Sequence, residues 1–367
     1  MLIFDGHLDL AGIALDCDRD LTLEVDQIRE LEAAGVHHDF GTATISLPAM
    51  KRGGVGLCLS TLLQRCKPFL SYDRDCSRCD ADRRTPEAAH AVACGQLAYY
   101  RLLESRNLVS IITTVAALDT HLQRLNTSPD TAPLGLIVTL AGADPITTPD
   151  ELHQWHAAGL RTLMLAHFGL SRYCHGTPSC DPEHTHDVPG PLTDLGRALL
   201  KEMAALDMPL DLSHTSDPSF DEAADRFQGR VYTSHTACRA LVDIPRNHSD
   251  AQLKTIIARD GVIGLPLYNP FINTIAPDDE NPPTTTLDHF INHVDHICQL
   301  AGNARHVTIG SDFDGGFGCE RIPVELDTAD DWPKMIDALG ARGYSADDTA
   351  AICSGNWLRF FKETLPA

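Results

Sequence analysis

The sequence predicts an α/β protein with one domain over residues 1–367, a (β/α)8 or TIM-type barrel with loop insertions. Three observations support this prediction. Short runs rich in β-branched and aliphatic residues recur along the chain, helix-like segments separate them, and His and Asp residues follow several of the runs. Strands that alternate with helices indicate a parallel sheet, and eight such units indicate a closed barrel.

The candidate strands are defined by their apolar runs. They are Leu2–Phe4, Gly56–Thr61, Leu136–Leu140, Thr162–Ala166, Pro209–Leu212, Val231–Thr233, Val262–Leu265 and Val307–Ile309. A further apolar run, Leu108–Thr114, does not fit this count. The clearest predicted helix is Asp194–Ala205, where Thr193 precedes apolar residues at helical spacing and can act as N-cap. A second helix is predicted over Asp347–Phe361, and 177–191 and 276–286 are predicted as long loops.

Composition and charge limit the partners of this protein. With 29 basic and 51 acidic side chains, the net charge is −22, so we expect no binding to nucleic acid or anionic membranes. We see neither an apolar stretch long enough for a transmembrane helix nor a signal peptide, and we predict a cytoplasmic protein. The twelve cysteines, the pair Cys76 and Cys79 included, are predicted to be reduced thiols. A homodimer is a possible assembly.

The first metal-ligand candidates follow the first strand, in the segment Asp5-Gly6-His7-Leu8-Asp9. Residues i and i+2 of an extended segment point to the same side, so His7 and Asp9 can both face the mouth of the barrel and bind one metal ion. A hydrogen-bonded His–Asp pair or a simple turn would give the same pattern. The motif alone is therefore a weak indication.

Two later strands each deliver a histidine after a serine. The fifth strand is followed by Ser213-His214, and the sixth by Ser234-His235. Neutral imidazole is a good ligand for Zn²⁺. The eighth strand leads into Gly310-Ser311-Asp312, where Asp312 could orient or deprotonate a water molecule beside the metal, and Asp314 could share its face. Because the active site of an α/β barrel lies where the strands end, these residues are predicted to meet there.

The motif series resembles that of the membrane dipeptidase (renal dipeptidase) family of the amidohydrolase superfamily, over nearly the whole chain. The similar segments are Asp5-Gly6-His7-Leu8-Asp9, Gly142-Ala143-Asp144-Pro145, His167, Asp211-Leu212-Ser213-His214, Ser234-His235, Pro245-Arg246-Asn247 and Gly310-Ser311-Asp312-Phe313-Asp314-Gly315. The resemblance implies a binuclear zinc site at the mouth of a barrel. It also implies hydrolysis of dipeptides by a zinc-activated water, with D-residues tolerated at the C-terminal position.

The resemblance also implies a role for each residue. His7 and Asp9 would bind one metal ion, and His214 and His235 the other. Asp312 would be the acid and base that serves the attacking water, and His167 would contact the scissile carbonyl and its oxyanion. Arg246 would bind the carboxylate of the substrate, for which a guanidinium offers two parallel hydrogen bonds. A solvated loop arginine and a packed core histidine are the alternatives for Arg246 and His167.

One residue departs from the family pattern. The family has a Glu that bridges the two metal ions directly before the Gly-Ala-Asp-Pro segment, where this chain has Ala141. Two divalent ions about 3.5–4 Å apart repel each other, and a bridging carboxylate offsets that repulsion. We therefore predict weakened metal binding, with one ion unless metal is abundant. Asp144 lies three residues further on and Asp211 points elsewhere by alternation, so neither is a clear substitute.

Three functions remain open at this point. The protein could be an active zinc dipeptidase, a divergent hydrolase acting on another amide, or a catalytically impaired member that only binds its ligand. The retained His7, Asp9, His214, His235 and Asp312 favour an enzyme, whereas Ala141 leaves its efficiency open. Metal stoichiometry distinguishes these alternatives.

Overall fold

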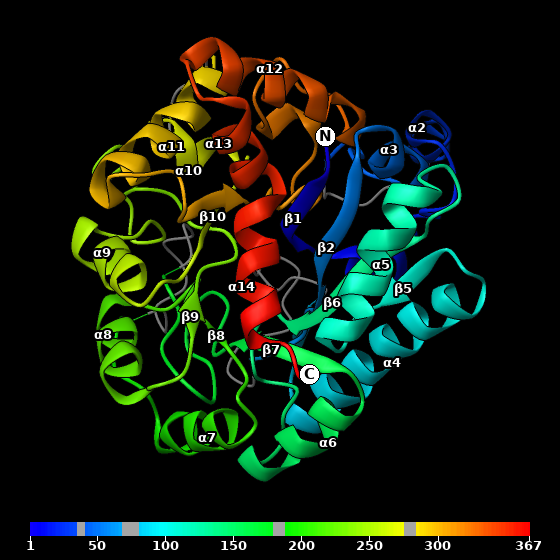
Figure 1. Ribbon diagram of the computed structural model, residues 1–367. Coiled ribbons are helices and arrows are strands. Elements are labelled where there is room, and N and C mark those ends of the chain that lie inside the picture. The colour runs from blue at the N-terminus through cyan, green and yellow to red at the C-terminus, as the bar shows by residue number, and fades with distance from the viewer. Residues whose placement is uncertain (35–40, 68–80, 179–187, 275–283) are drawn as a thin grey trace.

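A closed barrel of parallel strands forms the centre of the molecule, and helices cover its outside (Figure 1). The computed structural model describes residues 1–34, 41–67, 81–178, 188–274 and 284–367. Within these ranges the barrel strands are β1 (Ile3–Leu8), β2 (Val55–Leu62), β6 (Leu134–Leu140), β7 (Leu160–Met164), β8 (Leu210–Asp211), β9 (Val231–Tyr232), β10 (Ile263–Leu265) and β11 (Val307–Ile309). Each overlaps a predicted strand, and the predicted barrel is confirmed. Strand β1 runs four residues further than expected, so that His7 lies within the strand.

The ring closes through short bridges beyond the regular ladders. Strands β1, β2, β6, β7, β8 and β9 are paired in that order, and β10 pairs with β11. Thr233 bridges to Ile263 and so joins β9 to β10. At the other junction, the Asp312 N–H donates to the His7 carbonyl oxygen at 3.2 Å. The buried Asp5 carboxylate reinforces this junction by accepting the Ser311 N–H at 2.8 Å.

The additional apolar run forms a strand outside the eight of the barrel. Strand β5 (Val109–Ile111) pairs with the first half of β6, and β7 pairs with the second half of β6. The two short strands β3 (Arg65–Cys66) and β4 (Asp82–Arg83) pair with each other. The Cys76 and Cys79 pair lies outside the described residues.

The helices follow the strands along the chain. They are α1 (Leu10–Asp16), α2 (Val25–Ala33), α3 (Leu47–Arg52), α4 (Pro86–Ser105), α5 (Val115–Thr127), α6 (Leu152–Ala157), α7 (Asp194–Ala205), α8 (Asp217–Arg226), α9 (Asp250–Ala258), α10 (Asn269–Ile272), α11 (Leu287–Ala301), α12 (Trp332–Arg342), α13 (Ala346–Ala350) and α14 (Asn356–Thr364). The predicted bounds of α7 are confirmed. Its N-cap is Thr193, whose hydroxyl accepts the Gly196 N–H at 3.1 Å. None of the described helices is both long enough and apolar enough to cross a membrane.

The C-terminal helix differs from the prediction of one regular helix over 347–361. A π-helical turn, Ala351–Gly355, separates α13 from α14. The Thr308 hydroxyl donates to the Ile352 carbonyl oxygen at 2.8 Å, so a strand residue competes for a carbonyl of the helix. An inserted side chain of this kind is a common cause of a local irregularity in a helix. The sequence pattern of the helix alone could not reveal it.

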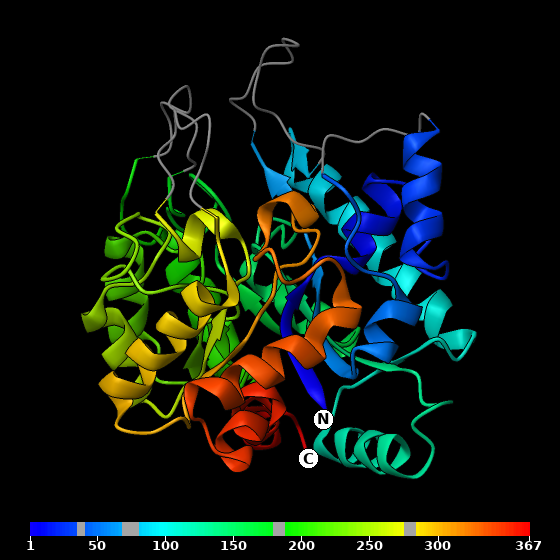
Figure 2. The same cartoon turned by 90° about the horizontal axis from the view of Figure 1, so that it is seen from above.

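Helix α14 covers the end of the barrel at which the strands begin, and both termini lie at that end (Figures 1 and 2). Trp357, Phe360 and Phe361 form a buried cluster with Phe4 of β1 and Tyr232 of β9. The Trp357 indole N–H donates to the Ile309 carbonyl oxygen at 2.8 Å, which satisfies the polar atom of this buried ring. The opposite end, where the strands finish, is thereby left for the functional residues.

Candidate metal centre and active site

Four of the predicted residues bring ligand atoms together where the strands end. The Nε2 atoms of His214 and His235 lie 3.0 Å apart. Two nitrogens bound tetrahedrally to one zinc ion would be about 3.3 Å apart, given Zn–N bonds of about 2.0–2.1 Å. His7 Nε2 lies 3.8 Å from the nearer carboxylate oxygen of Asp312. Among the described residues, His7, His235 and Asp312 form a group whose ligand atoms all lie within 4.8 Å of one another.

Asp9 completes this cluster from the end of β1. Its Oδ1 lies 3.7 Å from His7 Nε2, so the two side chains share one side of the segment, as residues i and i+2 should. Thr61, near the end of β2, donates its hydroxyl proton to the same oxygen of Asp9. This bond orients the carboxylate toward the histidines. Two carboxylates and three imidazoles then form a donor set that fits a divalent transition-metal ion.

The backbone at these residues is unusual. His214 has a φ of 59°, Asp312 of 60° and Asp314 of 58°, although none of them is glycine. Such left-handed conformations are uncommon for non-glycine residues and concentrate at functional sites, where the surrounding structure holds them. Because the side chains leave the backbone at altered angles there, simple alternation along a strand did not predict their directions.

Burial makes the electrostatics of the cluster favourable to a cation. Burial lowers the pKa of His7 to about 3, and lowers the pKa of His214 and of His235 well below the usual value, so the imidazoles are neutral. The pKa of Asp312 is raised well above its usual value by burial and then by the charge of Asp9. Burial also raises the pKa of Asp9 to about 6. A bound cation would offset both the burial and the repulsion between these acids.

A cavity of about 350 Å³ opens above the cluster. Its wall includes Asp9, His167, His214 and Asp312, together with the aromatic rings of Phe168, Tyr268, Phe271 and Phe317. Arg65 and Asp16 add one charge of each sign to the lining. A volume of this order suits a small ligand, and apolar walls with a few polar groups are typical of binding sites.

His167 and Arg246 each contact one histidine of the cluster. The His167 ring stacks on His214 with the ring centroids 4.0 Å apart, and its Nδ1 has no hydrogen-bond partner among the described residues. Arg246 is 2% exposed and donates from Nη2 to the His235 carbonyl oxygen at 2.6 Å. Its guanidinium lies over the ring of Phe271, 4.9 Å from the centroid, and Phe271 lines the cavity.

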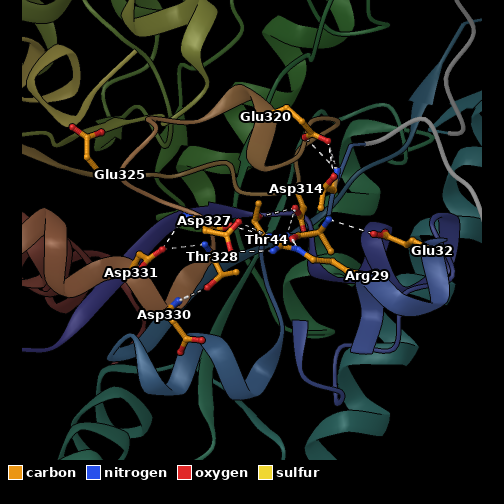
Figure 3. Close-up of polar contacts among 12 residues, drawn as sticks. Arg29, Glu32, Thr44, Asp314, Glu320, Glu325, Asp327, Thr328, Asp330 and Asp331 are labelled. Atoms are coloured by element: carbon orange, nitrogen blue, oxygen red, sulfur yellow. Dashed lines mark hydrogen bonds and ion pairs between the residues drawn. The ribbon is translucent and has the colours of Figure 1, made fainter. Parts of the chain in front are cut away.

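Two acids that the sequence left open have structural roles. Asp314 accepts the Thr44 hydroxyl at 2.6 Å and the backbone N–H groups of Thr44 and Ile45, and so ties the loop after β11 to the segment before α3 (Figure 3). Asp144 accepts the Cys66 N–H at 2.8 Å with one oxygen and the Ser171 hydroxyl at 2.6 Å with the other. With both oxygens engaged in this way, Asp144 does not replace a bridging ligand.

Ala141 directly follows β6 and is fully buried. Its N–H donates to the Leu62 carbonyl oxygen at 3.1 Å, so it stands beside the end of β2 in the ring of strand ends. A methyl group offers no ligand atom. Position 141 therefore contributes no donor atom to the cluster.

The prediction from sequence missed the serine that lies between two of the candidate metal ligands. The Ser234 hydroxyl lies 2.7 Å from His235 Nδ1 and 3.4 Å from His7 Nδ1. The only signal in the sequence was the serine that precedes each of the two histidines. Its significance depends on the approach of β1 to β9 across the barrel, which the local sequence does not reveal.

Two dipeptidases are similar in sequence to part of this chain. An uncharacterised dipeptidase of Schizosaccharomyces pombe is 31% identical over 217 residues, which are 59% of this chain and 50% of that protein. A dipeptidase of Aspergillus oryzae is 31% identical over 208 residues, 57% of this chain and 46% of that protein. These matches thus span about half the length of the two relatives.

Solved structures extend the similarity over the whole chain. The crystal structure of dipeptidase AC, a metallopeptidase of family M19, matches with a TM-score of 0.77 and 25% identity, covering 100% of this chain and 99% of that one. A metallopeptidase of Rhodobacter sphaeroides with a bound phosphinate mimic of L-Ala-D-Ala has the same fold, with a TM-score of 0.76, 24% identity and the same coverage. The family model of the membrane dipeptidases matches residues 1–366. This chain therefore belongs to the membrane dipeptidase family, peptidase family M19.

Proposed function

We propose that this protein is a zinc-dependent dipeptidase that hydrolyses the amide bond of dipeptides of the L-Xaa-D-Xaa type. The observation that carries the proposal is the gathering of His7, Asp9, His214, His235 and Asp312 below a cavity of about 350 Å³. Membership of a dipeptidase family supports the reaction class. The dipeptide mimic bound to the related Rhodobacter sphaeroides enzyme supports the stereochemistry of the substrate.

In this proposal His7, Asp9, His214 and His235 are metal ligands. A bound zinc ion would polarise the scissile carbonyl and increase the acidity of a neighbouring water molecule. Asp312 accepts the proton of the attacking water and returns it to the leaving amine, a task that suits a buried carboxylate with a raised pKa. His167 contacts the carbonyl oxygen as negative charge develops on it. Arg246 binds the carboxylate of the substrate.

The proposal is tested by metal content and hydrolysis together. We expect the purified protein to hold about one tightly bound zinc ion, because position 141 lacks the bridging carboxylate. We expect hydrolysis of L-Ala-D-Ala to stop after treatment with a chelator and to return on addition of zinc. A panel of L-Xaa-L-Xaa dipeptides measures the preference for the D-residue. If the protein binds a dipeptide at saturating zinc without hydrolysing it, the protein is a binding member of the family. If it binds neither zinc nor a dipeptide, the proposal is wrong.

Substitution of Ala141 by Glu tests the missing bridge. The new carboxylate would provide one oxygen to each of two metal ions, so we expect zinc content to rise from about one to about two per chain. Without metal, the same buried carboxylate should lower the free energy of unfolding by about 1–3 kcal/mol, because a polar group is then buried without a partner. Metal analysis and thermal unfolding with and without zinc measure both effects.

The matched control is Ala141→Gln, which has nearly the same shape without the charge. It should cause a similar loss of stability without recruiting a second ion. If the folded Glu variant holds no more zinc than the Gln variant, position 141 is not the bridging position.

A further inference from the structure

The hydroxyl of Ser234 lies between two of the proposed metal ligands. Its Oγ is 2.7 Å from Nδ1 of His235 and 3.4 Å from Nδ1 of His7, and the two rings are stacked with their centroids 3.8 Å apart. Both histidines thus direct the other ring nitrogen, Nε2, toward the metal centre. The backbone of Ser234 is held closely, because a Cβ at Gly264 or at Gly310 would lie 1.8 Å from its carbonyl oxygen.

This geometry constrains where the protons of the imidazoles reside. A neutral imidazole has one N–H, and a histidine that binds a metal through Nε2 must carry its proton on Nδ1. A serine hydroxyl can accept two hydrogen bonds but has only one proton to donate. Ser234 can therefore support both histidines only if it accepts from both and donates its own proton to a third group.

We take Asp211 to be that third group, because its carboxylate lies beside the two serines. Its Oδ1 accepts the backbone N–H groups of Ser213 at 2.9 Å and of Ser234 at 3.1 Å, which fixes the carboxylate beside the two serines. Its Oδ2 has no hydrogen-bond partner among the described residues and is therefore open to accept the Ser234 proton. Burial raises the pKa of Asp211, and the two serines beside it oppose that shift. Ser213 Oγ lies 3.3 Å from Ser234 Oγ.

His214 provides the contrast within the same cluster. Its Nδ1 has no hydrogen-bond partner among the described residues, so no acceptor holds a proton there. Its Nε2 lies 3.0 Å from Nε2 of His235. If the proton of His235 is on Nδ1, then Nε2 of His235 is an acceptor and Nε2 of His214 is the donor. These contacts are thus satisfied when His7 and His235 carry their proton on Nδ1 and His214 carries its proton on Nε2.

We propose that Asp211 and Ser234 hold His7 and His235 in the Nδ1–H tautomer, so that both Nε2 lone pairs face the metal ion before it binds. Ser234 is in this view a positioning residue that acts through two ligands at once. The inference deepens the proposed function and rests on its metal site. It makes a statement about the metal-free protein that can be tested separately.

The first experiment measures tautomers in the metal-free protein by nitrogen-15 NMR of the histidine rings. We expect His7 and His235 to be Nδ1–H and His214 to be Nε2–H. In Ser234→Ala, the populations of His7 and His235 should shift toward Nε2–H, while His214 keeps its tautomer. Ser234→Thr retains the hydroxyl and should restore the original pattern.

The second experiment measures zinc affinity by competition with a chromophoric chelator. Loss of an outer hydrogen bond to a metal-binding histidine typically costs 10–100-fold in affinity, and we expect a loss in this range for Ser234→Ala and recovery in Ser234→Thr. Ser213→Ala is the matched control, because this serine also precedes a histidine and is buried, but its hydroxyl contacts neither Nδ1. The loss of zinc affinity in Ser213→Ala should be clearly smaller than in Ser234→Ala. Asp211→Asn, whose amide can donate to Ser234, should also lower zinc affinity. It provides a second test if the Ser234→Ala variant does not fold.

The outcomes separate the two proposals. If His7 and His235 in the metal-free wild type are Nε2–H, or if folded Ser234→Ala binds zinc as tightly as the wild type, the inference is wrong and the dipeptidase proposal is unaffected. If the wild type has the expected tautomers but binds no zinc, the proposed function fails while the tautomer assignment stands.

Discussion

Replacement of Asp312 by Asn is expected to lower kcat for dipeptide hydrolysis by about 10²–10⁴-fold, the usual contribution of a positioned acid and base. Asp312 lies where β11 ends, 8% exposed, with its carboxylate 3.8 Å from Nε2 of His7 and in the wall of the cavity. Asn occupies nearly the same space but cannot accept the proton of an attacking water molecule. Because its side chain can still accept a hydrogen bond, we expect KM to change little.

Steady-state kinetics on L-Ala-D-Ala at saturating zinc, together with metal analysis, test this expectation. Asp16→Asn is the control, because Asp16 also lines the cavity but lies outside the group of potential metal ligands. We expect its kcat to remain within about threefold of the wild type, which is a far smaller change than the removal of a catalytic acid and base would cause. If Asp312→Asn loses zinc in parallel with activity, Asp312 is a metal ligand; if it retains near-normal kcat, the acid–base assignment is wrong.

Replacement of Trp357 by Ala is expected to lower the free energy of unfolding by about 3–5 kcal/mol, as for other large aromatic side chains in a core. Trp357 is fully buried at the end of the barrel that α14 covers. Its ring packs against Phe4, Tyr232 and Phe361, with centroids 5.9, 5.5 and 5.8 Å away. Its removal leaves a cavity and also leaves the Ile309 carbonyl oxygen without its donor.

Chemical denaturation followed by circular dichroism measures this loss. The control on the same helix is Lys362→Ala, which removes an exposed side chain paired with Asp119 at the surface. It should change stability by about 0.5 kcal/mol or less. If the Trp357 variant lost no more stability than the Lys362 variant, α14 would not be an integral part of the barrel core.

Much of the barrel could be predicted from sequence because its strands are buried on both faces and appear as short, continuous apolar runs. The run Val307–Ile309 coincides with β11, and Thr193 predicted the start of α7 because capping is a local interaction. By contrast, β5 looked like any other strand in sequence. In the structure, β5 and β7 pair with different halves of β6. This arrangement depends on pairing between segments that are distant along the chain.

The sequence by itself determined the barrel, the family and the residues able to hold a metal ion, because these depend on local pattern and on the spacing of chemically distinctive side chains. Only the tertiary structure decided how those residues act together. It placed Asp144 in a loop contact, put Asp312 in a left-handed conformation and brought the Ser234 hydroxyl between His7 and His235. Each of these outcomes depends on contacts between strands that are far apart along the chain, and such contacts have no signature in a local stretch of sequence.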